Sequence, residues 1–227
     1  MRNRNDLDKY LFENRYIYLF IATILQVFLI SFFSTGMGVL INALTFSFFM
    51  LACINLIRHS RRIIAFMIFF AVISILLVWI PDQSDLGQKF YPYERLIIIL
   101  FICMIIYQIL VQMIRSKKVS ADVIFGALTI YIFLGMLAGT SNQLIYYFDQ
   151  DAFMGNIDIT NDIDLRYYSF VTLTTLGYGD ITPVSQIARA TAVFYSLAGQ
   201  LYLAVIVALI VGKYISHSNK GEGEKIK

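Results

Sequence analysis

Six long apolar segments constrain the fold of this chain more than any other feature of its sequence. Each is 19 to 29 residues long, and a helix needs roughly 20 mostly apolar residues to cross a bilayer. Polar, glycine-containing or proline-containing breaks separate them, as at Gly36-Met37-Gly38 and Pro81-Asp82-Gln83. The segments cover residues 16–34, 38–57, 62–80, 95–114, 122–147 and 187–215. The sequence therefore predicts an all-α membrane protein with six transmembrane helices.

The composition agrees with a membrane protein, and no motif of the sequence indicates an enzyme. Hydrophobic residues make up 59% of the chain and charged residues 15%, whereas an average soluble domain has about 25% charged residues. The sequence contains no recognisable nucleotide-binding motif, metal-ligand cluster, catalytic constellation or signal peptide. We therefore expect no cofactor and no nucleic-acid partner.

Lysine and arginine are unevenly distributed between the two sides that this topology defines. Short cytoplasmic loops are enriched in basic residues, so the richer side, which includes both termini, is predicted to be cytoplasmic, in a plasma-membrane protein. Residues 1–15 and 217–227 are then short cytoplasmic segments. Arg95, at the outer end of its span, is expected to extend toward the lipid headgroups. The basic residues of the outer side are Lys89, Arg95, Arg166 and Arg189.

A short run between the last two apolar segments carries the strongest functional signal. It reads Thr175-Leu176-Gly177-Tyr178-Gly179-Asp180 and resembles the selectivity filter of potassium channels. In such a filter, successive backbone carbonyls replace the hydration shell of the ion. Aiming them at one axis requires φ > 0 at alternate positions, which Gly177 and Gly179 can adopt with little strain. Leu176 stands where valine is usual, and it keeps the carbonyl and an apolar side chain.

The resemblance covers a pore domain, residues 120–216. It implies an outer helix, a re-entrant pore helix from Asp162 or Asp164 (either as the N-cap) to Thr174, the filter, and an inner helix. One filter segment supplies a quarter of each carbonyl ring, so the resemblance implies a homotetramer. The compact size suggests a channel of bacterial type. Potassium is expected to bind, as the permeant ion, the carbonyls of Thr175, Leu176, Gly177 and Tyr178 and the hydroxyl of Thr175.

Residues next to the filter match positions that support it in the family. Tyr167 and Tyr168 stand where members often have an aromatic pair, and we expect their hydroxyls to brace Tyr178 or its neighbours. Ordinary interfacial aromatic residues are the alternative. Asp180 is expected to anchor the outer end of the filter or to add negative potential at the mouth. Where some members place a glutamate behind the filter, this chain has Val171.

The last apolar segment contains candidate gating residues. A glycine within a helix is about 1 kcal/mol less favourable than alanine, so Gly199 is interpreted either as a hinge of the inner helix or as a contact for a packed neighbour. An apolar face at helical spacing is either a gate that lines the pore or a surface toward lipid. Its residues are Leu203, Val207 and Val211. The run Gly135-Met136-Leu137-Ala138-Gly139 is predicted to let the outer helix approach the inner helix closely.

The first four apolar segments, residues 16–115, occupy the place of the sensor domain in six-span voltage-gated channels. A voltage sensor needs arginines in its fourth helix, because each charge that crosses contributes about 2.3 kcal/mol per 100 mV. Residues 96–114 contain no lysine or arginine, so we expect a sensor-like bundle without steep voltage dependence. A basic loop could bind anionic lipid headgroups or simply be a cytoplasmic loop. It contains Arg58, Arg61 and Arg62.

The sequence thus predicts a potassium-selective ion channel subunit. A weakly selective cation channel and a non-conducting, channel-like regulatory subunit remain alternatives. A potassium transporter built from pore-like repeats would carry several filter runs, whereas the run occurs once in this sequence.

Overall fold

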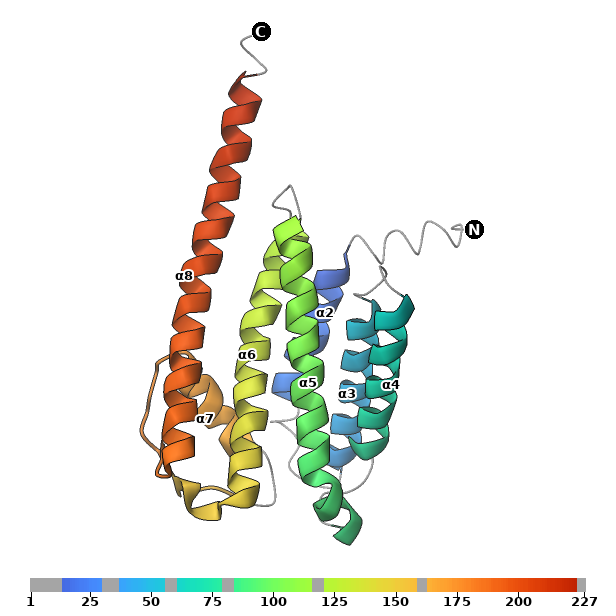
Figure 1. The fold of residues 1–227 in the computed structure, drawn as a ribbon, viewed down its shortest axis with the longest axis vertical. Coiled ribbons are helices and arrows are strands. Elements are labelled where there is room, and N and C mark those ends of the chain that lie inside the picture. Colours follow the sequence, from blue (N-terminus) through green and yellow to red (C-terminus); the bar gives the residue numbers. More distant parts are fainter. Residues whose placement is uncertain are drawn as a thin grey trace.

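The computed structural model describes residues 14–29, 37–55, 61–78, 84–115, 121–158 and 163–223. It is mostly helical, and its long helices stand side by side along one direction (Figure 1). In chain order the helices are α2 (Arg15–Phe28), α3 (Met37–Asn55), α4 (Arg61–Val78), α5 (Asp85–Arg115), α6 (Ala121–Phe148), α7 (Ile163–Leu173) and α8 (Gln186–Gly223). A short 3-10 helix, η2 (Gln150–Ala152), and two strands, β1 (Phe153–Gly155) and β2 (Ile181–Pro183), connect them.

Within the described ranges, three helices are long and apolar enough to cross a membrane, namely Asp85–Arg115, Asp122–Phe148 and Gln186–Leu209. They correspond to the last three predicted spans. The first three predicted spans contain helices of 14, 19 and 18 residues, and that these also cross the membrane stays a prediction. Arg58 and the side chains of Arg61 and Arg62 lie outside the described residues, and so does the predicted lipid contact.

Helix α6 is central to the bundle and packs against α2, α5, α7 and α8. Phe49 of α3 and Phe133 of α6 meet edge to face in the core, with ring centroids 5.7 Å apart. Helices in a bilayer associate largely through van der Waals packing, and this contact joins α3 to the α6 of its own chain. The same core includes Tyr16, Leu19, Met50, Phe101, Ile105 and Ile109.

The start of α2 is fixed to α6 and α5 by polar contacts. The backbone N–H of Tyr16 donates to Oδ1 of Asp122 at 3.1 Å, and the Tyr16 hydroxyl donates to Oε1 of Gln112 at 2.9 Å. The first N–H groups of a helix have no partner within the helix, and Asp122 supplies one from a distant part of the chain. Gly126 leaves room for the Tyr16 ring, whose nearest atom lies 3.2 Å from where a Cβ would stand.

Helix α5 begins ten residues before the predicted span. The hydroxyl of Ser84 accepts a hydrogen bond from the N–H of Gly87 at 2.9 Å, which stabilises this earlier start. Glu94 and Arg95 therefore lie inside the helix, 5% and 8% exposed. The predicted extension of Arg95 toward lipid headgroups is wrong, because its guanidinium lies 4.4 Å from the centre of the Tyr91 ring, within the protein.

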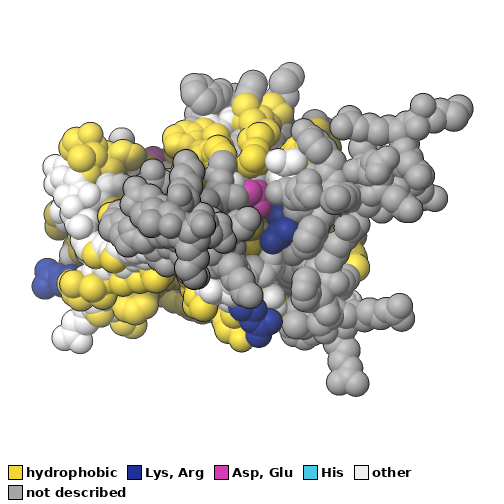
Figure 2. All heavy atoms as spheres, turned by 90° about the horizontal axis from the view of Figure 1, so that it is seen from above, with side chains coloured by type: hydrophobic (Ala, Val, Ile, Leu, Met, Phe, Trp, Pro, Cys, Tyr) yellow, Lys and Arg dark blue, Asp and Glu magenta, His cyan; other side chains and the backbone are white. Residues whose placement is uncertain are grey.

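Helix α8 projects beyond the rest of the bundle (Figure 1). It continues without interruption past residue 216, where the predicted pore domain ends, to Gly223. Seen from the end at which it projects, much of the described surface is hydrophobic (Figure 2). Large apolar side chains exposed along α8 include Ile187, Val193, Phe194, Leu197, Leu201 and Val205.

The two strands are absent from the predicted all-α fold. They pair antiparallel, with Phe153 opposite Pro183, Met154 opposite Thr182 and Gly155 opposite Ile181. The pairing joins the segment that follows α6 to the residues directly after the filter run. We refer to residues 149–158, which contain η2 and β1, as the turret segment.

Candidate functional site

Helix α7 is a short helix packed between α6 and α8 (Figure 1). Its 11 residues are too few to cross a bilayer, and its bounds lie close to those expected for the pore helix. Asp164 is not its N-cap, because it lies inside the first turn, where Oδ2 accepts a hydrogen bond from the N–H of Asp158 at 2.7 Å. Asp162 lies outside the described residues.

Two glycines of α6 allow α7 to approach closely. A Cβ at Gly135 would stand 2.3 Å from the ring of Phe170, and one at Gly139 would stand 3.4 Å from the Cα of Arg166. Both contacts are made by α7. The prediction that this pair faces the last long helix, α8, is therefore wrong, because the two glycines accommodate α7.

Hydrogen bonds join α7 to its two neighbours. On one side, Nδ2 of the buried Asn142 donates to the hydroxyl of Ser169 at 2.9 Å, and Ser169 donates to the carbonyl of Leu165 at 2.6 Å. On the other side, the hydroxyl of Ser196 donates to the carbonyl of Thr172 at 3.2 Å. Helix α7 is thus held by hydrogen bonds to both α6 and α8.

The filter run leaves α7 through hydrogen bonds to the last turn of that helix. The N–H of Thr175 donates to the carbonyl of Thr172 at 3.0 Å. The carbonyl of Val171 accepts from the N–H groups of Leu176 and Gly177 at 2.9 and 3.4 Å. The first amides of the run are therefore directed back toward the helix that supports it.

The backbone of the run alternates in conformation. Thr175, Gly177 and Gly179 have φ of 59°, 58° and 80°, whereas Leu176 and Tyr178 do not have positive φ. A Cβ at either glycine would meet nothing within 4 Å, so glycine is favoured there by its backbone conformation and not by lack of space. Positive φ is uncommon for a β-branched residue, and the sequence did not predict it for Thr175.

The two tyrosines of the predicted aromatic pair face different surroundings. The hydroxyl of Tyr167 donates to Oδ2 of Asp180 at 2.7 Å, and this hydrogen bond raises the pKa of Tyr167 to about 12. Tyr168 is 5% exposed, and its ring packs against Phe153 of β1 with centroids 5.4 Å apart. Tyr167 therefore contacts the end of the filter run, whereas Tyr168 belongs to the small core beneath the strands.

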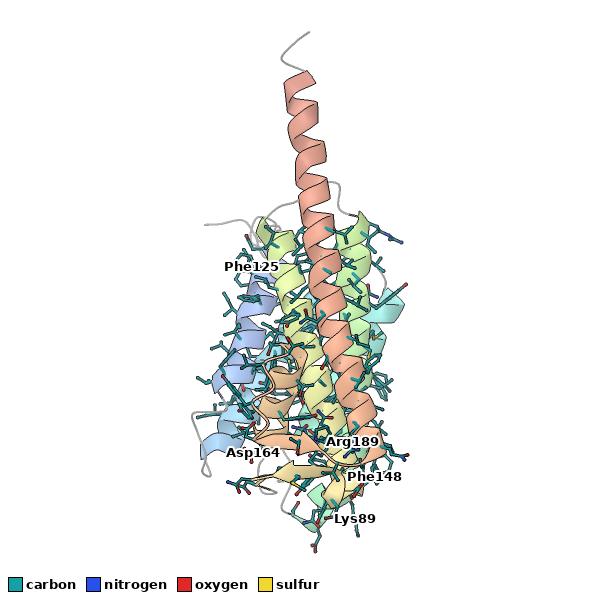
Figure 3. All side chains as sticks on the ribbon, turned by 90° about the vertical axis from the view of Figure 1, so that its left-hand side faces the viewer. Lys89, Phe125, Phe148, Asp164 and Arg189 are labelled. Carbon is teal, nitrogen blue, oxygen red and sulfur yellow. The ribbon has the colours of Figure 1, made fainter. Side chains whose placement is uncertain are left out.

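The end of the molecule that carries these contacts is seen from the side of α8 in Figure 3. Lys89, Phe148, Asp164 and Arg189 lie toward this end, and Phe125 lies toward the opposite one (Figure 3). Lys89 and Arg189, both predicted on the sparsely basic outer side, thus share one end of the molecule. Which face of the membrane this end occupies stays a prediction.

The candidate gating residues of α8 are in different situations. A Cβ at Gly199 would stand 2.6 Å from the carbonyl oxygen of Leu173 and 2.8 Å from its Cδ1, so Gly199 is a point of close contact with α7. Leu203 and Val207 are exposed, and the side chain of Val211 lies outside the described residues. That these residues form a hinge or a gate stays a prediction.

Gly155 is a residue of the site that the sequence did not reveal. Its φ is +144°, and a Cβ there would stand 2.5 Å from the backbone oxygen of Asp180. The strand-forming residues Phe153 and Ile181 next to glycine and proline were the available signal, but three-residue strands are too short for periodicity to identify.

Comparison with known proteins identifies the same part of the chain. Residues 118–216, which contain α6, α7, the filter run and most of α8, match the family described as ion channel. This part of the chain is therefore similar to members of that family. Together with the potassium-channel relatives described next, this match confirms the predicted resemblance to potassium channels, and the segment is similar to channels and not to enzymes. A bacterial type stays a prediction.

Two relatives of this ion-channel segment come from Arabidopsis thaliana. Two-pore potassium channel 2 is 32% identical over 97 residues, which is 42% of this chain and 20% of the relative. Two-pore potassium channel 5 is 32% identical over 96 residues, 42% of this chain and 21% of the relative. The chain thus spans about a fifth of the length of these curated relatives. No solved structure matches.

Proposed function

We propose that the chain is a subunit of a potassium-selective channel that conducts passively. The observation that carries the proposal is the alternation of positive φ at Thr175, Gly177 and Gly179. With this alternation, consecutive carbonyls can turn toward one axis and replace the water around a potassium ion. The proposed ligands are the carbonyls from Thr175 to Tyr178 and the Thr175 hydroxyl. The two relatives, both named as potassium channels, favour the same ion.

A ring of such carbonyls needs several chains, and we propose four identical ones. The filter run occurs once in this sequence, and a potassium filter is formed by four loops. Leu176 and Tyr178 are 56% and 67% exposed, and the apolar surface of α8 is uncovered, so neighbouring chains have surface to pack on. The mass of the purified complex tests this, with four chains expected and two chains contradicting it.

Conduction is proposed to depend little on voltage. Between Leu96 and Ile114, α5 contains no lysine or arginine, and Arg95 is packed inside the protein. The chain is proposed to cross the plasma membrane six times with both termini in the cytoplasm. An apolar constriction at Leu203, Val207 and Val211 is the proposed gate.

The deciding experiment measures the reversal potential of the purified protein in planar bilayers under opposed potassium and sodium gradients. The test variant is Gly177→Ala. Alanine at this position must adopt a left-handed backbone conformation, which costs roughly 1–2 kcal/mol. Gly212→Ala is the matched control, because its Cβ also meets nothing within 4 Å but replaces a glycine of α8 without positive φ.

The wild type and Gly212→Ala are expected to reverse near the potassium equilibrium potential. Gly177→Ala is expected to lower the ratio of potassium to sodium permeability on the order of tenfold. A wild-type reversal near zero would favour the weakly selective cation channel. Silence of an assembled complex at all voltages would favour the non-conducting subunit.

A further inference from the structure

The turret segment contacts the chain directly beyond the filter run. Gly155 lies opposite Ile181 in the two-stranded sheet, and a Cβ at Gly155 would stand 2.5 Å from the Asp180 oxygen and 3.0 Å from the Ile181 Cα. Both of these are backbone atoms, which cannot rotate away as the end of a side chain can. Only glycine, at φ +144°, fits this contact without displacement of one strand.

Further contacts hold the turret segment in this place. The carbonyl of Ala152 accepts hydrogen bonds from the N–H groups of Val184 and Ser185 at 2.8 and 3.2 Å. Phe153 is buried with Ile181 and Tyr168 in one small core. The chain after the filter therefore has backbone pairing on one side and apolar packing beneath it.

Asp180 is consequently restrained from two directions. Its carboxylate accepts the 2.7 Å hydrogen bond from the Tyr167 hydroxyl, and its backbone oxygen rests against Gly155. The pore helix thus holds the side chain, and the turret holds the backbone. The residue immediately before Asp180 is Gly179, the outermost residue of the run with positive φ.

We propose that the turret segment positions the outer end of the filter, with Gly155 as a positioning residue that acts through the backbone of Asp180. The inference rests on the proposed function, since it concerns the geometry of a conducting filter. A side chain at position 155 displaces β1 or the Asp180 peptide, and a displaced peptide alters the carbonyl positions next to it. The contact between Gly155 and Asp180 then contributes to selectivity, and the turret segment is more than a connection between helices.

A filter whose outer end is weakly held should depend more on bound potassium to keep its conducting conformation. Potassium bound between carbonyls stabilises the arrangement that binds it, by mass action. Loss of the Gly155 contact therefore raises the external potassium concentration needed to maintain steady current. This dependence separates a positioning role from a general contribution to folding, which would lower the amount of assembled channel without changing its potassium dependence.

The test compares Gly155→Ala with Met154→Ala in planar bilayers. Met154 is the neighbouring residue of β1 and is 66% exposed, so its truncation alters the same strand without touching Asp180. Gly155→Ala is expected to raise the half-saturating external potassium concentration for steady current on the order of tenfold and to lower potassium selectivity at low external potassium. Met154→Ala is expected to behave as the wild type.

Each outcome decides the proposal. Wild-type potassium dependence in an assembled Gly155→Ala channel overturns the positioning role and leaves the proposed function intact. A wild type that does not select potassium overturns both. If Gly155→Ala does not assemble, the second variant is Phe153→Leu, which weakens the packing of β1 on Tyr168 without entering the space beside Asp180. This variant must then show a smaller increase in the half-saturating external potassium concentration. An unchanged Phe153→Leu channel then refutes the proposal.

Discussion

Replacement of Gly199 by alanine distinguishes the two interpretations of this residue. The added Cβ would stand 2.6 Å from the Leu173 carbonyl oxygen, whereas favourable contacts between non-bonded atoms lie at about 3.5 Å or more. Helix α8 must therefore move away from α7 by roughly 1 Å. Overpacking of this kind typically lowers the free energy of unfolding by about 1–3 kcal/mol. The greater helical preference of alanine raises it by about 1 kcal/mol.

Gly212→Ala is the control, because α8 has no described atom within 4 Å of that Cβ. It gains the helical preference, about 1 kcal/mol, without the collision. The free energy of unfolding should therefore be lower for Gly199→Ala than for Gly212→Ala by about 1–3 kcal/mol per chain. At about 2–4 °C per kcal/mol, thermal unfolding of the purified, detergent-solubilised protein resolves this difference.

Equal unfolding temperatures for the two alanine variants would refute the packing interpretation. A residue that serves only as a hinge tolerates alanine in the straight helix, and Gly199→Ala would then be as stable as Gly212→Ala. In that case the effect of the substitution would be confined to the opening of the channel, measured as open probability in bilayers.

Two further predictions concern the contacts of α7. Gly135→Ala should destabilise the protein by about 1–3 kcal/mol, because its Cβ meets the Phe170 ring. Phe170→Leu in the same chain should restore part of this stability. Thermal unfolding of the wild type, the two single variants and the double variant measures the coupling. The hydrogen bond to Asp180 raises the pKa of Tyr167 from 10.0 to about 12, so its stabilising contribution is complete below about pH 10 and is lost as the pH rises through about 12. The alkaline absorbance titration of the wild type minus that of Tyr167→Phe should show one tyrosine titrating near this value, and a midpoint near pH 10 would contradict the contact.

The sequence by itself determined the features that depend on local chemistry. Apolar segments of bilayer length predict helices wherever they stand in the fold, and three of them, α5, α6 and α8, have the length and hydropathy of spans. The short helix before the filter run was also predictable, because polar residues precede it and glycines follow it. Local backbone preference likewise made Gly177 and Gly179 candidates for positive φ.

Only the tertiary structure decided which surfaces meet. A small residue such as Gly135 indicates that another helix packs closely there but does not identify that helix. In the structure it is α7 and not α8. Arg95 had the place in the sequence of a residue that extends toward lipid, yet the earlier start of α5 put it inside the protein. Gly155 and Asp180 are far apart in the sequence, and no local pattern indicates that they are in contact. Such contacts depend on the relative positions of whole helices, which arise from packing over many residues and leave no periodic trace in the sequence.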